Sequence, residues 1–126
     1  WKKPSVMLIG EANYSNAHGT PWVYKTQKVG KLVGMPVPGT MTSVWWETQI
    51  DRSLYFGVPI VGYVDANGNY LENQQLEPDV KVRMDYQKLS QGHDTQLEKA
   101  VEVLLQECDS VKATSPWTAI DAKYSK

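Results

Sequence analysis

A serine stands where an apolar run gives way to a segment of helical character. Ser15 lies a few residues after the run Val6–Ile9, and a helical pattern continues from it to Val29. The first N–H groups of a helix have no partner within the helix, and the helix dipole adds partial positive charge there. An oxyanion forming at Ser15 would meet these donors, the N–H of Asn16 first among them. Serine is also a preferred helix N-cap, and the local sequence alone favours that structural role.

A nucleophilic serine needs a group that takes its proton, and the chain contains two histidines. His18 follows Ser15 by three residues, so the two can share a helix face. Side by side on one helix, however, the imidazole would not lie between the serine and a leaving group. His93 lies in a polar segment before a second helix and is expected on the solvated surface. Neither histidine is a convincing base.

Composition narrows the class of protein. The 126 residues suit one modest domain or a piece of a larger one, and 41 % apolar content is that of a globular chain. With 13 Lys and Arg against 14 Asp and Glu and no basic stripe, nucleic acid is not an expected partner. No apolar run approaches the ~18 residues of a membrane span. A single cysteine excludes an internal disulfide and a cysteine metal cluster, and no metal or cofactor is expected.

The first third of the chain predicts a strand, a helix and a second strand. The continuous apolar run Val6–Ile9 is typical of a strand covered on both faces in a parallel sheet. Pro21 is expected to kink the helix or to restart it, with Thr20 as a fresh cap, and Gly30 to end it. Lys31–Gly34 predicts a second parallel strand, which completes a right-handed βαβ unit.

A loop and an alternating segment follow. Met35–Thr40 holds two prolines and a glycine and predicts a loop at the carboxyl edge of the sheet, where ligands bind in open α/β folds. Polar and apolar residues alternate over Thr42–Thr48, as in a strand. Its tryptophans, Trp45 and Trp46, are expected to fill the core, with a substrate groove as the alternative.

The next segments predict further strands. Tyr55–Val64 is rich in strand-forming residues, and Pro59 places part of it at a sheet edge or bulge. The Asn-Gly pair within Asp65–Asn69 indicates a hairpin, with Tyr70–Glu72 as its return strand. Lys81–Arg83 predicts one more short strand.

The clearest helix lies near the end of the chain. Thr95–Glu98 has the capping-box pattern. Behind it, one helical face carries the apolar residues Leu97, Val101, Leu104 and Cys108, with Ala100 and Leu105 beside them. On this face Cys108 is expected to be a packed thiol. Asp109–Lys126 is polar and is expected to be a tail.

Four motifs in a fixed order resemble a family. They are Asn-Tyr-Ser-Asn-Ala at 13–17, Gly-Met-Pro-Val-Pro-Gly at 34–39, Leu-Glu-Asn-Gln-Gln-Leu-Glu-Pro-Asp-Val at 71–80, and Gly-His-Asp-Thr-Gln-Leu-Glu-Lys-Ala at 92–100. Together they resemble the carboxyl-terminal part of the catalytic domain of tricorn-type and C-terminal processing, or tail-specific, serine peptidases. The resemblance implies an α/β, crotonase-like (Clp-protease/crotonase) fold of layered ββα units with a C-terminal capped helix. Residues 1–108 would be the C-terminal half of that domain, and 109–126 a polar tail.

The resemblance also assigns roles to residues. Ser15 would be the nucleophile and the N–H of Asn16 an oxyanion donor. Processing peptidases take their base from a lysine at the position of Thr40, which this chain lacks. Tricorn-type members use a histidine from well upstream, oriented through a second serine and a glutamate that matches Glu72. We therefore expect the base histidine upstream of this chain, which alone should not hydrolyse peptides.

The function implied is that of a serine endopeptidase that cleaves peptide bonds through an acyl-enzyme. Expected partners are a peptide or unfolded protein substrate, the upstream half of the same catalytic domain, and a second copy of the protein. The chain opens without Met and without a signal-peptide pattern, so we expect it to be cut from a longer protein, and the resemblance implies a periplasmic or secreted location.

Two alternatives remain at this point. One is a catalytically inactive domain of the same fold that binds peptides, with Ser15 as a cap. The other is a crotonase-like acyl-transfer enzyme, which the peptidase motifs disfavour. Outside the resemblance, Glu72 would be an exposed residue at the end of a hairpin, and Asn13–Ser15 would match a glycosylation sequon.

Overall fold

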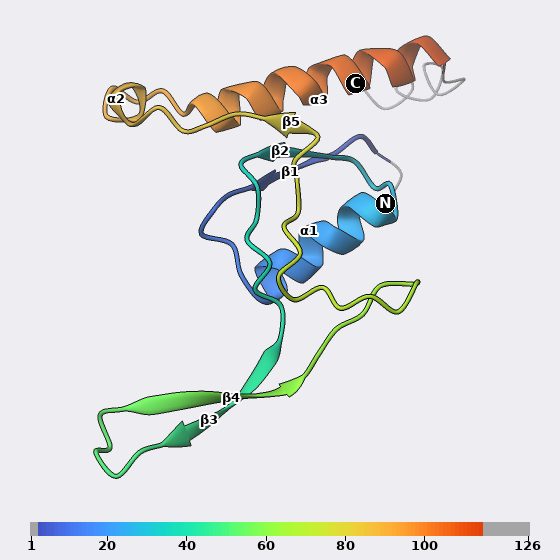
Figure 1. Cartoon of the computed structure of the whole chain (residues 1–126). Helices are drawn as coiled ribbons and strands as arrows, with labels where there is room; N and C mark the ends of the chain where they lie inside the picture. The colour runs from blue at the N-terminus through green and yellow to red at the C-terminus, as the bar shows by residue number, and fades with distance from the viewer. Residues whose placement is uncertain (1–2, 115–126) are drawn as a thin grey trace, which may run out of the picture.

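The parallel sheet predicted from the first two apolar runs is present in the computed structural model, which describes residues 3–114. Helix α3 lies on one side of this sheet and helix α1 on the other, and a separate two-stranded ribbon projects from the body (Figure 1). The elements in chain order are β1 (Val6–Ile9), α1 (Asn16–Thr26), β2 (Lys31–Gly34), β3 (Ser43–Thr48), β4 (Tyr55–Val61), β5 (Val80–Lys81), α2 (Tyr86–Leu89) and α3 (Thr95–Thr114).

The sheet has the order β1-β2-β5, with all neighbours parallel. Val6 pairs with Lys31 and Ile9 with Gly34, so β1, α1 and β2 form the predicted βαβ unit. On the α1 side, Ile9 and Leu32 join a buried cluster that Trp22 and Tyr24 of α1 cover in part.

The opposite face of the sheet packs against α3. Val33 forms a second buried cluster there with Ala100 and Val103 of α3. Leu8 remains 44 % exposed on β1, so the expectation of a strand covered on both faces is only partly correct. The residues that the structure describes leave part of this face uncovered.

Helix α1 runs without a break through Pro21, so the predicted restart with Thr20 as a fresh cap is wrong. Proline lacks the N–H that would bond the carbonyl of Ala17, four residues before it. The side-chain amide of Asn13 donates to that carbonyl instead, with 3.0 Å between Nδ2 and O. The helix also ends before Gly30, because Lys28 takes the left-handed conformation with φ of 53°.

Strands β3 and β4 form the projecting antiparallel ribbon. They pair from Val44 with Pro59 to Thr48 with Tyr55, and the register shifts next to Pro59, where a bulge or edge was predicted. Trp45 and Trp46 are 60 % and 66 % exposed, so the expectation that they fill the core is wrong. The physical reason is that no second layer from residues 3–114 covers the ribbon (Figure 1).

The hairpin turn after β4 forms as predicted, but its return strand does not. The N–H of Asp65 donates to the carbonyl of Asn69 at 2.9 Å, and Val64 makes an isolated bridge with Tyr70. The chain then turns at Glu72 rather than continuing as a strand. Strand β5 spans Val80–Lys81, so it begins one residue and ends two residues earlier than the predicted Lys81–Arg83.

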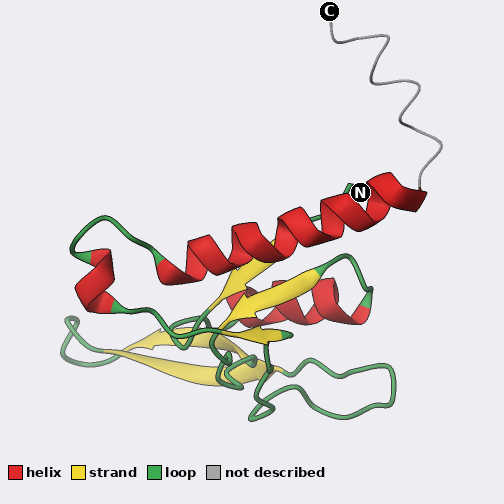
Figure 2. Ribbon diagram, turned by 90° about the horizontal axis from the view of Figure 1, so that it is seen from above, coloured by secondary structure: helices red, strands yellow, loops and turns green. Residues whose placement is uncertain are grey.

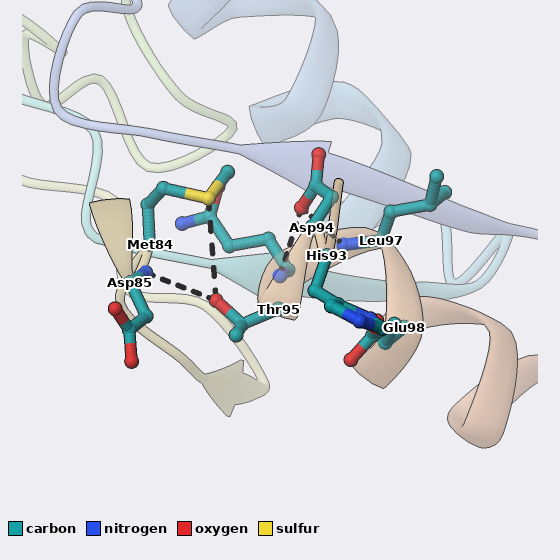
Figure 3. Close-up of polar contacts among 8 residues, drawn as sticks. Met84, Asp85, His93, Asp94, Thr95, Leu97 and Glu98 are labelled. Carbon is teal, nitrogen blue, oxygen red and sulfur yellow. Dashed lines mark hydrogen bonds and ion pairs between the residues drawn. The ribbon is translucent and has the colours of Figure 1, made fainter. Parts of the chain in front are cut away.

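The start of α3 differs from the predicted capping box. Asp94 is the cap, because its Oδ1 accepts from the N–H groups of Gln96 and Leu97 at 3.0 and 2.9 Å. The hydroxyl of Thr95 faces the other way: it accepts from the N–H of Asp85 (Figure 3), and it donates to the carbonyl of Arg83. These bonds fix the segment before α2 against the start of α3.

The face of α3 that meets the sheet agrees only in part with the predicted one, which included Ala100 but not Val103. Ala100 and Val103 are 3 % and 5 % exposed, whereas Leu97, Val101 and Leu105 are 50 %, 48 % and 59 % exposed. Helix α3 lies along one side of the structure (Figure 2). The exposed side chains of Leu97, Val101 and Leu105 leave an apolar strip open on it.

The helix continues to Thr114, beyond the predicted start of a tail at Asp109, and residues 115–126 lie outside those described. No helix within residues 3–114 has the length and apolarity needed to cross a membrane.

Candidate active site

Ser15 has a backbone that an ordinary capping serine does not adopt. Its φ is 54° and its ψ is −123°, whereas an N-cap residue is usually extended. Its hydroxyl makes no capping hydrogen bond, and nothing else within residues 3–114 bonds it. The peptide groups around it are held: its N–H donates to the carbonyl of Thr40 at 2.7 Å, and its carbonyl accepts from His18 and Gly19. Such a conformation costs about 1–3 kcal/mol and persists only where the surroundings impose it.

The N–H of Asn16 is the first helical donor after the serine. It has no partner among the residues that the structure describes, while the next N–H, that of Ala17, donates to the carbonyl of Tyr14 at 2.9 Å. Asn16 is exposed at the start of α1, so its N–H is free to meet a negatively charged oxygen beside Ser15.

Glu72 is a fixed, half-buried carboxylate rather than a free hairpin residue. Its Oε2 accepts three hydrogen bonds, from the Thr42 hydroxyl at 2.7 Å and from the N–H groups of Met41 and Thr42 at 2.8 and 2.6 Å. These donors, the Thr42 hydroxyl first, lower the pKa of Glu72 below its ordinary value. Its other oxygen, Oε1, has no partner within residues 3–114.

One short segment of chain connects the two residues. The carbonyl of Thr40 binds Ser15, and the next two residues, Met41 and Thr42, bind Glu72. The buried Met41 side chain lies against Gly19 of α1, where an added Cβ would come within 2.6 Å of Met41 Cε. The segment 40–42 therefore joins the serine, α1 and the carboxylate. The role of Thr42 could not be predicted from local sequence, because its partner is 30 residues away.

His18 is fully buried, and neither ring nitrogen has a hydrogen-bond partner in the described part of the chain. Burial lowers its pKa, and the negative charge of Glu72 opposes this in part. A ring with no exposed surface does not contact a substrate that binds from solvent, which agrees with the weak case for His18 as a base.

The burial of His18 predicts a pH dependence of stability. Because its folded pKa lies below its ordinary 6.5, the unfolded chain takes up a proton first as the pH falls, and the free energy of unfolding decreases below about pH 6.5. We expect His18→Leu to lose less thermal stability than the wild type between pH 7.5 and pH 5.5. The control His93→Gln changes an exposed histidine and should behave as the wild type. Equal losses in the wild type and in His18→Leu would contradict this.

His93 and Asp79 have structural roles. His93 lies on the surface, as predicted, and its Nδ1 is 3.1 Å from Glu98. In the turn before β5, Asp79 Oδ2 accepts from the N–H of Leu32 at 2.8 Å, and its Oδ1 is 3.1 Å from Lys25 Nζ. Asp79 thus holds α1, β2 and the turn together.

The chain belongs to peptidase family S41, a family of serine peptidases, because the model of that family matches residues 1–82. This confirms the family that the four motifs resemble. A comparison with curated proteins gave no match.

Two solved structures show the same fold. The crystal structure of the tricorn protease matches with a TM-score of 0.72 and 19 % identity, over 82 % of this chain and 10 % of that one. The crystal structure of mature CPAF matches with a TM-score of 0.57 and 25 % identity, over 64 % of this chain and 16 % of that one. The chain is thus a mixed α/β unit with a parallel sheet and a C-terminal helix that corresponds to part of such a peptidase domain, and it spans only a small share of either relative.

Proposed function

We propose that this chain carries the nucleophile of a serine endopeptidase, with Ser15 attacking the peptide bond. The single observation that carries the proposal is the backbone of Ser15, held at positive φ before a helix, with a hydroxyl that makes no hydrogen bond within residues 3–114. Other hydrolases expose their nucleophilic serine at a strained turn that leads into a helix. Membership of a serine peptidase family adds independent support.

The proposed reaction follows from the groups at this turn. Ser15 Oγ forms a bond to the carbonyl carbon of the substrate and loses its proton to a base, and the carbonyl oxygen becomes negative. The N–H of Asn16 donates to that oxygen. Collapse of the intermediate breaks the C–N bond, and the amine leaves with the proton from the base. Water then hydrolyses the acyl-enzyme and frees Ser15.

We propose Glu72 as the residue that orients the base. The three bonds to Oε2 keep the carboxylate ionised and fixed, and Oε1 is free to accept another. In tricorn-type peptidases the matching glutamate acts on the histidine through a second serine. On this view the histidine and that serine come from upstream sequence, which also supplies the second oxyanion donor and most of the specificity pocket.

We also propose that residues 1–108 are the C-terminal half of a crotonase-like domain of ββα layers, and that its upstream half covers the open apolar strip on α3. Support comes from Leu8, Leu97 and Val101, which are 44 %, 50 % and 48 % exposed and line a shallow hollow between β1 and α3. A longer polypeptide would complete this core.

The remaining expectations stay proposals that rest on the resemblance alone. They are a peptide or unfolded protein as substrate, a periplasmic or secreted location, and association with a second copy of the protein.

The location of the base can be tested with two lengths of protein. We expect a polypeptide that includes about 200 residues upstream of Trp1, on the scale of one further domain, to cleave casein, and the 126-residue chain to show no cleavage above buffer. The upstream polypeptide with Ser15→Ala is the control. Equal cleavage by the short chain would place the base within it. Absence of cleavage by both lengths would favour the inactive peptide-binding alternative.

A further inference from the structure

A cavity of about 500 Å³ opens directly beside the start of α1. Asn16 and Gly19, one and four residues after the proposed nucleophile, form one wall. Most of the remaining lining is apolar or aromatic: Trp22, Val23, Met41, Tyr63, Val64 and Leu71. Within residues 3–114, no charged side chain lines it.

We propose that this cavity is a substrate subsite that binds one large apolar side chain, of leucine or phenylalanine size, close to the bond that is cleaved. The inference rests on the proposed function, since it takes Ser15 as the reacting residue. To a specificity pocket that we expect mostly from upstream sequence, it adds one subsite formed by this chain and the class of side chain that this subsite selects.

Asn16 relates the position of the cavity to the bond that is cleaved. The same residue offers the N–H for the oxyanion and lines the cavity, so a substrate carbonyl at that N–H lies at the cavity's edge. Successive residues of an extended peptide are about 3.3 Å apart, and their side chains alternate in direction. A side chain within a few residues of the scissile bond therefore reaches the cavity.

The chemistry of the lining determines which side chain is favoured. A carboxylate or ammonium group placed against Trp22, Val64 and Leu71 would lose water without gaining a charged partner. An apolar side chain instead gains from burial, and full burial of a leucine or phenylalanine corresponds to a gain in affinity on the order of tenfold to a hundredfold.

One residue in the wall of the cavity, Met41, also bonds a proposed catalytic group. Met41 lines the cavity, and its N–H donates to Glu72 Oε2 at 2.8 Å. Methionine is flexible and polarizable, so this wall can adapt to leucine and phenylalanine alike. An occupant of the cavity therefore packs against the segment that positions Glu72.

A second hollow, of about 570 Å³, shares Trp22 and Val64 with the first and continues to Gln27 and Asp65. The two hollows thus follow α1 away from Ser15. This continuity favours an extended peptide over a compact small molecule as the occupant.

Binding can be measured separately from hydrolysis. The protein is the polypeptide with its upstream part and the substitution Ser15→Ala. The probes are fluorescein-labelled alanine hexapeptides with leucine, phenylalanine, aspartate or lysine at the third position, and fluorescence anisotropy gives Kd. Because every other residue of the peptide is alanine, the peptide can shift along the site until its one variable side chain reaches the cavity. The position of the scissile bond therefore need not be known. We expect the leucine and phenylalanine peptides to bind at least about tenfold more tightly than the other two.

A charge placed in the wall should change the preference. Val23 is 51 % exposed at the cavity, so Val23→Lys can be accommodated, and we expect it to favour the aspartate peptide over the leucine peptide by about tenfold relative to the parent. The matched control is Val29→Lys, the same substitution at a residue beyond the far end of α1. Val29 is 39 % exposed and does not line the cavity. It should leave the ratios unchanged.

Two results would overturn the subsite: equal binding of all four peptides, or the same ratios in Val23→Lys and Val29→Lys. The proposed function is judged separately, by a fluorophosphonate adduct on the polypeptide that retains Ser15. An adduct without side-chain preference refutes the subsite alone. Preference without an adduct supports the subsite as a peptide-binding site and refutes the hydrolase.

Discussion

Replacing Ser15 by alanine in the polypeptide that contains the upstream part is expected to lower kcat/KM for peptide cleavage by about 10⁴–10⁶. Without the hydroxyl no acyl-enzyme forms, and the remaining rate comes from oxyanion stabilisation and substrate binding alone. The measurement is steady-state cleavage of a fluorogenic peptide, with thermal unfolding to show that the variant folds. Because the Ser15 hydroxyl makes no hydrogen bond within residues 3–114, its loss should change stability little.

The matched control for this substitution is Ser53→Ala. Ser53 is an exposed serine in the turn of the ribbon, and its hydroxyl donates to Asp51 at 2.8 Å. It should retain wild-type kcat/KM. A Ser15→Ala protein that keeps more than about a tenth of the activity would show that another group is the nucleophile.

The second large effect is expected for Glu72→Gln, which keeps the shape of the side chain and removes its charge. Loss of an orienting carboxylate lowers kcat by up to about 10⁴ in other serine peptidases, and we expect a loss of about 10² or more here with little change in KM. One oxygen of the glutamine can still accept from Met41 and Thr42, so the segment 40–42 should stay in place.

Glu77→Gln provides the control for the charge itself. Glu77 is an exposed carboxylate in the same segment, 3.7 Å from Lys81 in an ion pair. If Glu72→Gln and Glu77→Gln reduce kcat equally, the charge acts through the general field of the protein. The proposed orienting role would then be wrong.

Much of the fold could be predicted from the sequence because it depends on local patterns. The apolar runs that became β1 and β2 are short and continuous, as expected for parallel strands, and the register of the two strands is regular. The start of α1 at Asn16 follows from the change of periodicity after Ser15. Family membership was also accessible, since it rests on the order of four short motifs.

Other features depend on contacts that local patterns do not contain. Helix α1 continues through Pro21, and the side chain of Asn13 bonds the Ala17 carbonyl that the proline leaves without a helical partner. Trp45 and Trp46 alternate like core residues, but their exposure depends on whether another layer covers the ribbon. In α3 the apolar strip is wider than the face that the small sheet covers, so periodicity alone could not identify the buried residues.

The candidate site likewise has features that local sequence predicts and features that only tertiary contacts determine. Ser15 could be selected from its place before a helix, but its positive φ could not, because serine rarely adopts it without tertiary constraint. The contacts of Glu72 with Met41 and Thr42 join residues about 30 positions apart, and only the fold brings them together. The burial of His18 likewise required the structure.

The most direct test of the central claim is to map the adduct of a fluorophosphonate on the polypeptide with its upstream part. After labelling and digestion, mass spectrometry identifies the modified residue. We predict a stoichiometric adduct on Ser15 and none in the Ser15→Ala variant. An unmodified Ser15 in a folded protein that cleaves peptides, with the adduct on another residue, would contradict the account.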